Sequence, residues 1–449
     1  MSGLETVTSS VEDVLIDSLQ FKPAPGASYL TAKRNTRWHA SGSDTYSSNT
    51  GVKVLRFALT GAAQEWCDPQ SIRLQFDVNA GGDANTFLKP LTGPWCFINR
   101  VSLRVLGTLV EDITMYGRCY EQFFRGLTKD ARQREIDLGF GGTVDSDGNV
   151  SIEKINQGTK KTVTMNLLCG LFSGQSKYLW LSAMGPITLE IELANADSGL
   201  NMNPHADQGG AASSTWSITN AMVLGSVVDV SPDLLNAYTK HLEEGRSLPY
   251  HFGTFSNVEH SIAGLDSLSV NQSRSFSRLS TLLVSFLRQE VAVPADTGAG
   301  TTADPTVRYP SRRDVTHFAG KTAGDTLAAA DDNLEAYIAL GANRYPVYPT
   351  QAMCTHYMFY LDALGKLNSD AHHPGMTLKK YRKDGLILGW NLEKAHSGSG
   401  AAWSAISTRN GDLLSVFIKN APATANRMMV TAHFEVICRI SAQGCDLLD

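Results

Sequence analysis

The chain has 449 residues, which is long enough for two or three domains with substantial cores. Only 18% of the residues are charged and 39 are glycine, a balance that favours a β-sandwich protein over a helical one. The net charge of −5 excludes a global field that would draw the chain onto nucleic acid.

The N-terminal stretch is acidic and is expected to be an arm, residues 1–27. Residues 4–19 can form a short amphipathic helix, whose apolar positions are Val7, Val11, Val14, Leu15 and Leu19. The following FKPAPGASY cannot continue a helix and is expected to be extended. No signal peptide is recognisable and no apolar run approaches the ~20 residues of a membrane span, so the protein is expected to be intracellular when it is made.

Residues 28–230 are expected to form a first β domain. Short segments with period-two alternation are separated by turn-rich stretches, as in YLTAKRNTRWHA, GVKVLRFALTG and SIRLQFDVNA. The clearest strand has Leu189, Ile191 and Leu193 alternating with glutamates. About eight such strands with one inserted helix are typical of a jelly-roll sandwich.

Within this domain, VSLRVLGTLVEDITMYGRCYEQFFRGL predicts a buried strand, a turn, a return strand and a helix. Val101, Leu103 and Val105 alternate with polar residues, and Gly107 interrupts the pattern. Asp112 occupies the position expected for the helix N-cap. Five large side chains then share one helix face, namely Tyr116, Tyr120, Phe123, Phe124 and Leu127.

The same helix face occurs a second time, 237 residues further along the chain. The same intervals separate Met353, Tyr357, Tyr360, Leu361 and Leu364. One amphipathic helix is a common pattern. Two copies with identical spacing, each set among alternating strands, indicate a duplicated β domain.

Residues 231–247 are expected to be a connecting helix, and residues 248–449 a second β domain. Ser231 is placed at the N-cap, Pro232 in the first turn and Gly245 after the last turn. The expected buried face of this helix comprises Leu234, Leu235, Tyr238 and Leu242. The predicted fold is all-β with a few inserted helices, as two consecutive eight-stranded jelly-roll sandwiches.

The motif ADTGA around Asp296 matches the segment that carries the catalytic aspartate of retroviral-type aspartic proteases. That chemistry needs two aspartates that share a proton on rigid elements with apolar flanks. Here the motif follows Pro294 and leads into GTTADP, so a mobile loop is the favoured interpretation.

Two further motifs could suggest metal binding. Asp145, Asp147 and Asn149 resemble the start of a calcium loop, but the later glycine and glutamate of such a loop are missing, which favours a hairpin turn. His372 and His373 have no cysteine or further histidine nearby, which favours a solvated turn. The sequence predicts no catalytic residue, no cofactor and no metal ligand.

Basic residues and cysteines give no stronger signal of a site. The basic clusters lack interleaved aromatic residues, so solvated faces or subunit contacts are favoured over nucleic-acid sites. These clusters are Arg125, Lys129, Arg132 and Arg134; Arg308, Arg312 and Arg313; and Lys379, Lys380, Arg382 and Lys383. The seven cysteines form no CxxC pair and are expected to be buried free thiols.

The segment LVEDITMYGRCY resembles a feature of the double jelly-roll major capsid proteins of the polinton, adintovirus and nucleocytoplasmic large DNA virus lineage. In that family a strand runs into a "VEDI.NY.R" segment and then a helix. Here Glu111 to Ile113 and Tyr116 to Arg118 match, whereas Thr114, Met115 and Gly117 depart from the pattern. Further similarities, in the same order along residues 28–449, are Trp66 to Pro69, Trp180-Leu181, Tyr345-Pro346 and Tyr348-Pro349.

The resemblance implies a non-enzymatic structural protein of a virion, made in the host cell cytoplasm. Its family members form homotrimers that act as pseudo-hexagonal capsomers and tile the icosahedral shell of a double-stranded DNA virus. Neighbouring capsomers, penton proteins and minor capsid or cement proteins are the implied partners. Residues 291–332, and also 195–214, would then form outward towers.

The acidic N-terminus bears on the partners independently of the family. A capsid protein that condenses its genome directly generally needs a basic arm. We therefore expect no direct sequence-specific nucleic-acid binding, and an inner face that meets an internal membrane or other virion proteins. Two alternatives stay open from the sequence: a secreted-type double jelly-roll hydrolase acting on glycans, and a lectin-like binding module.

Overall fold

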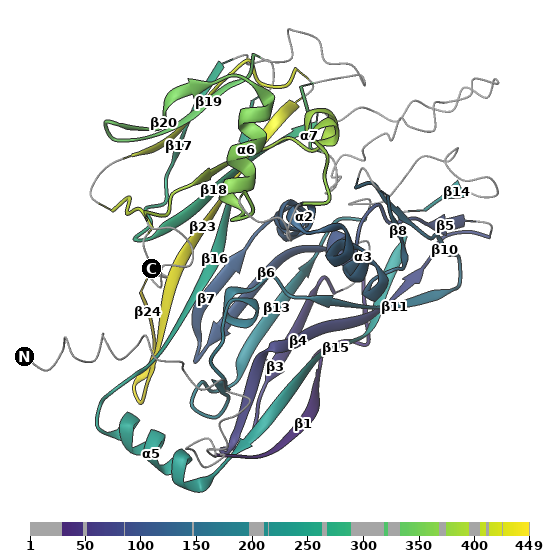
Figure 1. Ribbon diagram of the computed structural model, residues 1–449. Helices are drawn as coiled ribbons and strands as arrows, with labels where there is room; N and C mark the ends of the chain where they lie inside the picture. The colour runs from purple at the N-terminus through teal and green to yellow at the C-terminus, as the bar shows by residue number, and fades with distance from the viewer. Residues whose placement is uncertain are drawn as a thin grey trace, which may run out of the picture.

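The computed structural model describes residues 29–47, 52–84, 86–145, 148–196, 211–213, 215–262, 267–288, 318–321, 333–367, 374–394, 405–409, 413–423 and 425–448. Over these residues the chain forms two β-sandwiches that pack against each other (Figure 1). We call them the first sandwich, with the main strands from β1 to β15, and the second sandwich, with the main strands from β16 to β23.

The first sandwich consists of two main sheets. One has the order β1 (Leu30–His39), β15 (Trp216–Val230), β4 (Glu65–Ala80) and β11 (Lys160–Asn166), with β2 (Thr45–Tyr46) and β12 (Leu179–Trp180) attached. The other has the order β3 (Val54–Leu59), β13 (Ile187–Leu193), β6 (Ile98–Val105) and β7 (Thr108–Ile113). Minor pairings involve β5 (Thr86–Leu88), β10 (Ile155–Asn156) and β14 (Ala211–Ala212), and the hairpin β8 (Gly142–Val144) with β9 (Val150–Ile152).

The second sandwich also consists of two main sheets. One has the order β16 (Leu248–Ser261), β23 (Ala425–Ser441), β18 (Leu279–Arg288) and β21 (Ile387–Asn391), with β24 (Gly444–Leu448) beside β23. The other has the order β17 (Ser267–Gln272), β22 (Leu414–Lys419), β19 (Glu335–Leu340) and β20 (Asn343–Thr350).

The two sandwiches share one topology. When the eight main strands of each are numbered along the chain, one sheet has the order first, eighth, third, sixth, and the other has the order second, seventh, fourth, fifth. This is the strand order of a jelly roll. The predicted fold, two consecutive eight-stranded jelly-roll sandwiches, is therefore confirmed.

Short helices connect the strands. They are η3 (Pro94–Phe97), α2 (Tyr116–Gly126), α3 (Lys129–Leu138), α4 (Gly170–Ser173), α5 (Pro232–Glu243), α6 (Met353–Ala363) and α7 (Leu378–Asp384). Helix α2 lies between the fifth and sixth main strands of the first sandwich, and α6 lies between the fifth and sixth of the second. The repeated helix face therefore marked equivalent positions, as the sequence predicted. Among the described helices, none is both long and apolar enough to cross a membrane.

Local sequence explains several features of these elements. Residues on β13 alternate strictly between buried and half-buried, because Leu189 and Ile191 face the core while the glutamates between them face outward. Leu106 and Gly107 both have positive φ, 50° and 84°, which permits the tight turn from β6 into β7. On α3, the Thr128 side chain accepts a hydrogen bond from the Ala131 N–H at 3.3 Å and caps the helix.

Two predicted helix features are wrong. Asp112 does not cap α2, because it lies within β7 and pairs with Arg100, while Met115 in a left-handed conformation precedes the helix. The connecting helix α5 has no fully buried residue, so its predicted buried face is only half-buried. Tyr238 of that face packs its ring against Trp66, with centroids 5.2 Å apart.

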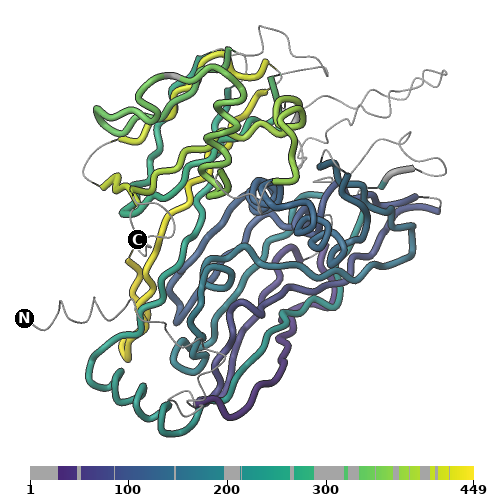
Figure 2. The backbone as a smooth tube through the Cα atoms, in the orientation of Figure 1, coloured from purple at the N-terminus to yellow at the C-terminus, as the bar shows by residue number. Residues whose placement is uncertain are grey.

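The two sandwiches share a continuous apolar core. One cluster of buried side chains extends from Trp38 on β1 to Ile440 on β23. Figure 2 shows the reason: the long strands β16 and β23 extend from the second sandwich and run alongside the first. Each sandwich therefore stabilises the position of the other through buried apolar surface.

Candidate functional site

The segment from Glu111 to Arg118, which carries the resemblance to capsid proteins, lies where the two sandwiches meet. We call this contact region the junction; it comprises β7, α2, α3 and α4 of the first sandwich and β16, β18, α6 and α7 of the second. In Figure 1, α2 has the sheets of the first sandwich on one side and helix α6 of the second sandwich on the other. For a protein whose sequence predicts assembly rather than catalysis, such a contact between repeated units is the relevant site.

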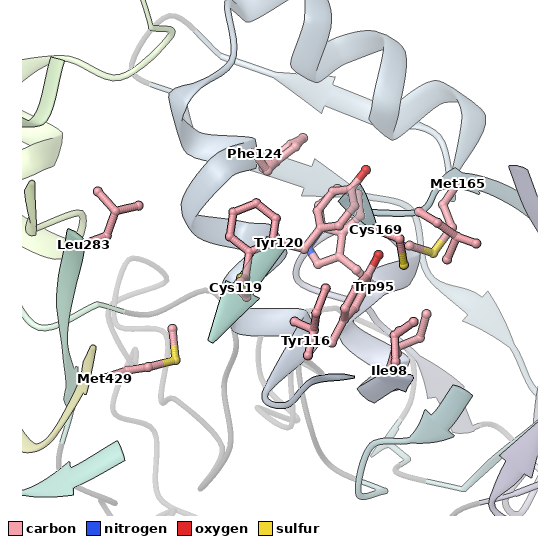
Figure 3. Packing of buried hydrophobic residues seen from close by; sticks show 14 of the residues in the cluster. Trp95, Ile98, Tyr116, Cys119, Tyr120, Phe124, Met165, Cys169, Leu283 and Met429 are labelled. Atoms are coloured by element: carbon pink, nitrogen blue, oxygen red, sulfur yellow. The ribbon is translucent and has the colours of Figure 1, made fainter. Parts of the chain in front are cut away.

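The aromatic face of α2 fixes that helix to its own sandwich. Trp95 of η3 stacks on Tyr120 with ring centroids 4.4 Å apart, and its ring lies 4.7 Å from that of Phe124. The Tyr116 hydroxyl accepts a hydrogen bond from the Leu168 N–H at 2.6 Å. Figure 3 shows these rings grouped around Trp95. Buried aromatic rings of this size dominate local packing energy, so the helix position is strongly determined.

Glu111 and Asp112 of the motif fix the position of strand β7 in the junction. The Glu111 carboxylate accepts hydrogen bonds from the N–H groups of Gly170 and Leu171, at 2.8 and 3.2 Å, at the start of α4. Asp112 accepts two hydrogen bonds from Arg100, at 2.6 and 2.7 Å. Burial raises the pKa of Glu111, while the two backbone N–H groups oppose that rise. Glu111 therefore ties α4 to β7.

Strand β16 packs on these elements from the second sandwich. The Asn257 side chain donates a hydrogen bond to the Thr114 carbonyl at 2.6 Å. The Phe255 ring lies 4.8 Å from the ring of Phe123 on α2. Helix α4 approaches so closely that a Cβ on Gly170 would lie 1.9 Å from the Gly253 carbonyl oxygen of β16. Backbone touches backbone at this point.

The two repeated helices also meet through polar contacts. The Gln122 side chain of α2 donates to the Ser285 hydroxyl of β18 at 2.8 Å, and the Tyr360 hydroxyl of α6 donates to the Gln122 carbonyl at 3.3 Å. Lys366 donates to the Gly126 carbonyl. Each of these hydrogen bonds joins a residue of the first sandwich to a residue of the second, so together they fix the relative orientation of the two repeats.

The buried Glu121 carboxyl joins α2 to the segment that contains Thr92 and Trp95. Glu121 accepts hydrogen bonds from Thr92 at 2.7 Å and from Trp95 Nε1 at 3.1 Å, and pairs with Arg125 at 3.2 Å. Burial raises the pKa of Glu121, and the Arg125 charge opposes that rise. The Arg125 guanidinium also lies 4.7 Å from the ring centre of Phe318.

Arg132 on α3 connects the sandwiches with its guanidinium. It donates to the Gly148 carbonyl at 3.2 Å and to the Gly375 carbonyl, which precedes α7. Nearby, the Lys380 ammonium donates to the Asn149 side chain at 2.7 Å. Arg132 is only 2% exposed, and burial lowers its pKa. The expectation of a solvated basic face is therefore wrong for Arg132, and equally for the buried Arg125.

Sequence reasoning missed most of the junction residues. Gln122, Asn257 and Phe255 carry no local signal, because their partners lie more than a hundred residues away. The Glu111–Tyr116 segment was the signal that did locate the site. The cysteine prediction holds for five residues, but Cys354 is exposed and Cys445 is half-buried.

The motifs considered for metal binding or catalysis divide into two groups. Asp145 and Asn149 close the β8–β9 hairpin, where the Asp145 carboxylate accepts the backbone and side-chain N–H groups of Asn149, both at 2.7 Å, which confirms the hairpin interpretation. Asp147, Asp296, His372, His373 and the cluster at Arg308 to Arg313 lie outside the described residues, as do most residues of the two predicted towers. Within the described ranges, no group of three His, Cys, Asp or Glu side chains could hold a metal ion.

Comparisons with known proteins now bear on this arrangement. No model of a protein family matches the sequence, and no curated protein matches it. Solved structures do match. A subunit from the PBCV-1 virus capsid has a TM-score of 0.60 at 14% identity, over 96% of this chain and 99% of that chain. The Faustovirus major capsid protein has a TM-score of 0.60 at 10% identity, over 96% of this chain and 94% of that chain.

This chain has the fold of a double jelly-roll major capsid protein. A chain from the structure of the Sputnik virophage adds a third match, with a TM-score of 0.56 at 10% identity over 98% of this chain and 93% of that chain. All three matches extend over both sandwiches. At these identities the similarity establishes the fold, and the duplicated strand order established it independently.

Proposed function

We propose that this protein is the major capsid protein of an icosahedral double-stranded DNA virus, with a structural and non-enzymatic role in the virion. Three copies would form a capsomer that presents six similar sandwiches. Because each chain supplies two of the six, the trimer approximates a hexagon and can tile a shell. Other copies of the capsomer are its principal partners, together with penton and minor capsid or cement proteins at special positions.

The observation that carries this proposal is the exact repetition of topology within one chain. Both sandwiches have the same order of eight strands, and each places a helix between its fifth and sixth strands. A lectin-like binding module needs only one concave site and gains nothing from this repetition, whereas a double jelly-roll glycan hydrolase would share it and is separated from a capsid protein by its oligomeric state. A hexagonal tile made from three chains requires it. The extended match to the Faustovirus major capsid protein supports the same function.

The proposed domain limits follow from the same repetition. We assign residues 28–230 and 248–449 to the two building blocks, with 231–247 as the connector and 1–27 as an arm. The position of α5 between β15 and β16 supports this division.

Size-exclusion chromatography with light scattering tests the function. We expect the purified protein to be a stable trimer, since an obligate interface of over about 2,000 Å² per contact resists dilution. Negatively stained particles should have hexagonal outlines. A monomer at all accessible concentrations would contradict the proposal and would favour the glycan-acting enzyme.

A further inference from the structure

The last two strands of the chain bring two cysteines together. Strands β23 and β24 form a hairpin with the turn Ala442-Gln443, and Ile440 lies opposite Cys445. Cys438 lies two residues before Ile440, so its side chain leaves the same face of the sheet as that of Cys445. The two Sγ atoms are 3.2 Å apart, and both cysteines are free thiols. Because a two-residue turn fixes the register of a hairpin, the thiols are held in this proximity.

A small movement separates this pair of thiols from a disulfide. An S–S bond is about 2.05 Å long, so the sulfur atoms must approach each other by roughly 1 Å. Each sulfur can move by rotation about its own Cα–Cβ bond. Ser441 orders the turn, since its hydroxyl donates a hydrogen bond to the Gly444 carbonyl at 3.1 Å. The two strands can therefore keep their register when the bond forms.

The two thiols differ in their access to solvent and in their acidity. Cys438 is 0% exposed, whereas Cys445 is half-buried and can meet a small molecule. With the Cys438 thiol as donor, their hydrogen bond lowers the pKa of Cys445, and the same hydrogen bond together with burial raises the pKa of Cys438. Because the thiolate is the nucleophile in disulfide exchange, Cys445 is suited to the first attack and Cys438 to the second.

We propose that Cys438 and Cys445 form a disulfide when the folded protein meets a small-molecule disulfide such as oxidised glutathione. The Cys445 thiolate attacks one glutathione sulfur, the S–S bond of glutathione breaks, and the departing thiolate takes up the proton that Cys445 lost. The Cys438 sulfur then attacks Cys445 Sγ, the mixed disulfide breaks, and the second glutathione leaves with the Cys438 proton. Two protein thiols lose two electrons, and one glutathione disulfide becomes two thiols.

The bond would fasten the last strand to elements of both sandwiches. Strand β24 lies beside β7 of the first sandwich at the lower end of β23 (Figure 1), and the Thr108 hydroxyl donates to the Cys445 carbonyl at 3.2 Å. On the other side of β23, Tyr250 of β16 lies opposite Cys438. Terminal strands fray readily, and a covalent link across the hairpin restrains that motion. Oxidation would therefore stabilise the contact of β24 with β7.

The redox state of the surroundings determines when this bond forms. Thiols are kept reduced in the cytosol, whereas disulfides form and persist outside the cell. For a capsid protein that change comes when a particle leaves its host cell, so the bond would form after assembly. The chemistry itself does not depend on the proposed capsid function, and purified protein of any oligomeric state can be tested for it.

Trypsin gives a direct readout because Arg439 lies between the two cysteines. Cleavage after Arg427 and Arg439 yields peptides 428–439 and 440–449, each with one cysteine. All tests use a Cys354→Ser background, because that exposed thiol on α6 would also react. After the folded, reduced protein is incubated with oxidised glutathione and its free thiols are alkylated, we expect mass spectrometry to find the two peptides joined. The titratable thiols of the denatured protein should fall by two. Peptides that stay separate would overturn the proposal.

Single substitutions separate the roles of the two thiols. Cys438→Ser should retain glutathione on Cys445, because the second attack is missing. Cys445→Ser should carry no glutathione on the buried Cys438. Glutathione on Cys438 in that variant would overturn the proposed order of attack, and a lasting adduct on Cys445 when both cysteines are present would overturn the disulfide itself.

Unfolding in denaturant tests the structural effect of the bond. We expect oxidised protein to have a higher midpoint than reduced protein, while the same glutathione treatment should leave the midpoint of Cys445→Ser unchanged. An equal rise in that variant would assign the effect to another thiol. A lower midpoint on oxidation would show that the bond distorts the hairpin, and would overturn the stabilisation of β24.

Discussion

His433 on β23 is a buried histidine whose ring packs against Phe255 of β16, a strand of the junction. Its ring stacks on Phe255 with centroids 4.9 Å apart and lies over Gly253, where a Cβ would come within 2.3 Å of Nε2. The Ser280 hydroxyl lies 2.8 Å from Nδ1. Burial lowers the pKa of His433 to about 4, so the imidazole is neutral in the folded protein near pH 7.

The lowered pKa predicts a loss of stability in mild acid. The unfolded chain binds a proton at this histidine below its ordinary pKa of 6.5, whereas the folded chain does so only near 4. Stability is therefore fully present above pH 6.5 and is lost as the pH falls toward 4. Between pH 7 and pH 5 the loss should be roughly 2 kcal/mol.

Chemical denaturation of wild type and His433→Gln at both pH values measures this loss. The difference between the two proteins isolates His433 from groups with the opposite sign, such as Glu435, whose pKa burial raises to about 7. His241→Gln, on α5 away from the junction, is the control and should follow the wild type. Parallel pH profiles for wild type and His433→Gln would refute the prediction.

At the scale of elements, the contact between α4 and β16 is a backbone contact that requires glycine. A Cβ at position 170 would overlap the Gly253 carbonyl oxygen, which belongs to a long strand and cannot rotate away. We expect Gly170→Ala to lower the free energy of unfolding by at least about 2 kcal/mol, since overpacking against fixed atoms forces backbone shifts. Thermal melting and denaturant titration measure the effect.

Gly158→Ala provides the matched control for that substitution. Gly158 has a φ of 73° and no atom within 4 Å of a Cβ, so alanine there adds backbone strain of roughly 1 to 2 kcal/mol and no collision. An alanine at 170 that is tolerated better than the one at 158 would show that β16 moves freely, contrary to expectation.

The elements also show how far sequence reasoning could reach. The alternation in β13 and the repeated face of α2 and α6 are local patterns, and both predicted the structure correctly. Asp112 failed as a cap because a cross-strand partner, Arg100, competes for the same carboxylate. Arg132 failed as a solvated residue because its acceptors, the carbonyls of Gly148 and Gly375, are created only by folding.

At the scale of the whole molecule, charge argues against direct genome binding. The chain has a net charge of −5, and two of its clustered arginines, Arg125 and Arg132, are buried in the junction and cannot reach phosphates. Affinity for DNA depends on accessible cations that displace counterions. Burial in the junction therefore removes these two arginines from any surface that could bind phosphates.

We accordingly expect purified trimers to bind double-stranded DNA no better than a neutral control protein at physiological salt. Fluorescence anisotropy with a labelled duplex at two salt concentrations measures this. Tight binding that weakens steeply with salt would contradict the expectation and would point to a basic surface created by assembly.

The unequal cover of α2 and α6 has a consequence for lattices. In a ring of three such chains the six helices would alternate between an α2 with nine of its eleven residues buried and an α6 on which Cys354 and Met358 are exposed. A neighbouring ring could then distinguish a rotation of one sixth of a turn from a rotation of one third. Duplication followed by divergence would thus give a shell orientational order that six identical units could not encode.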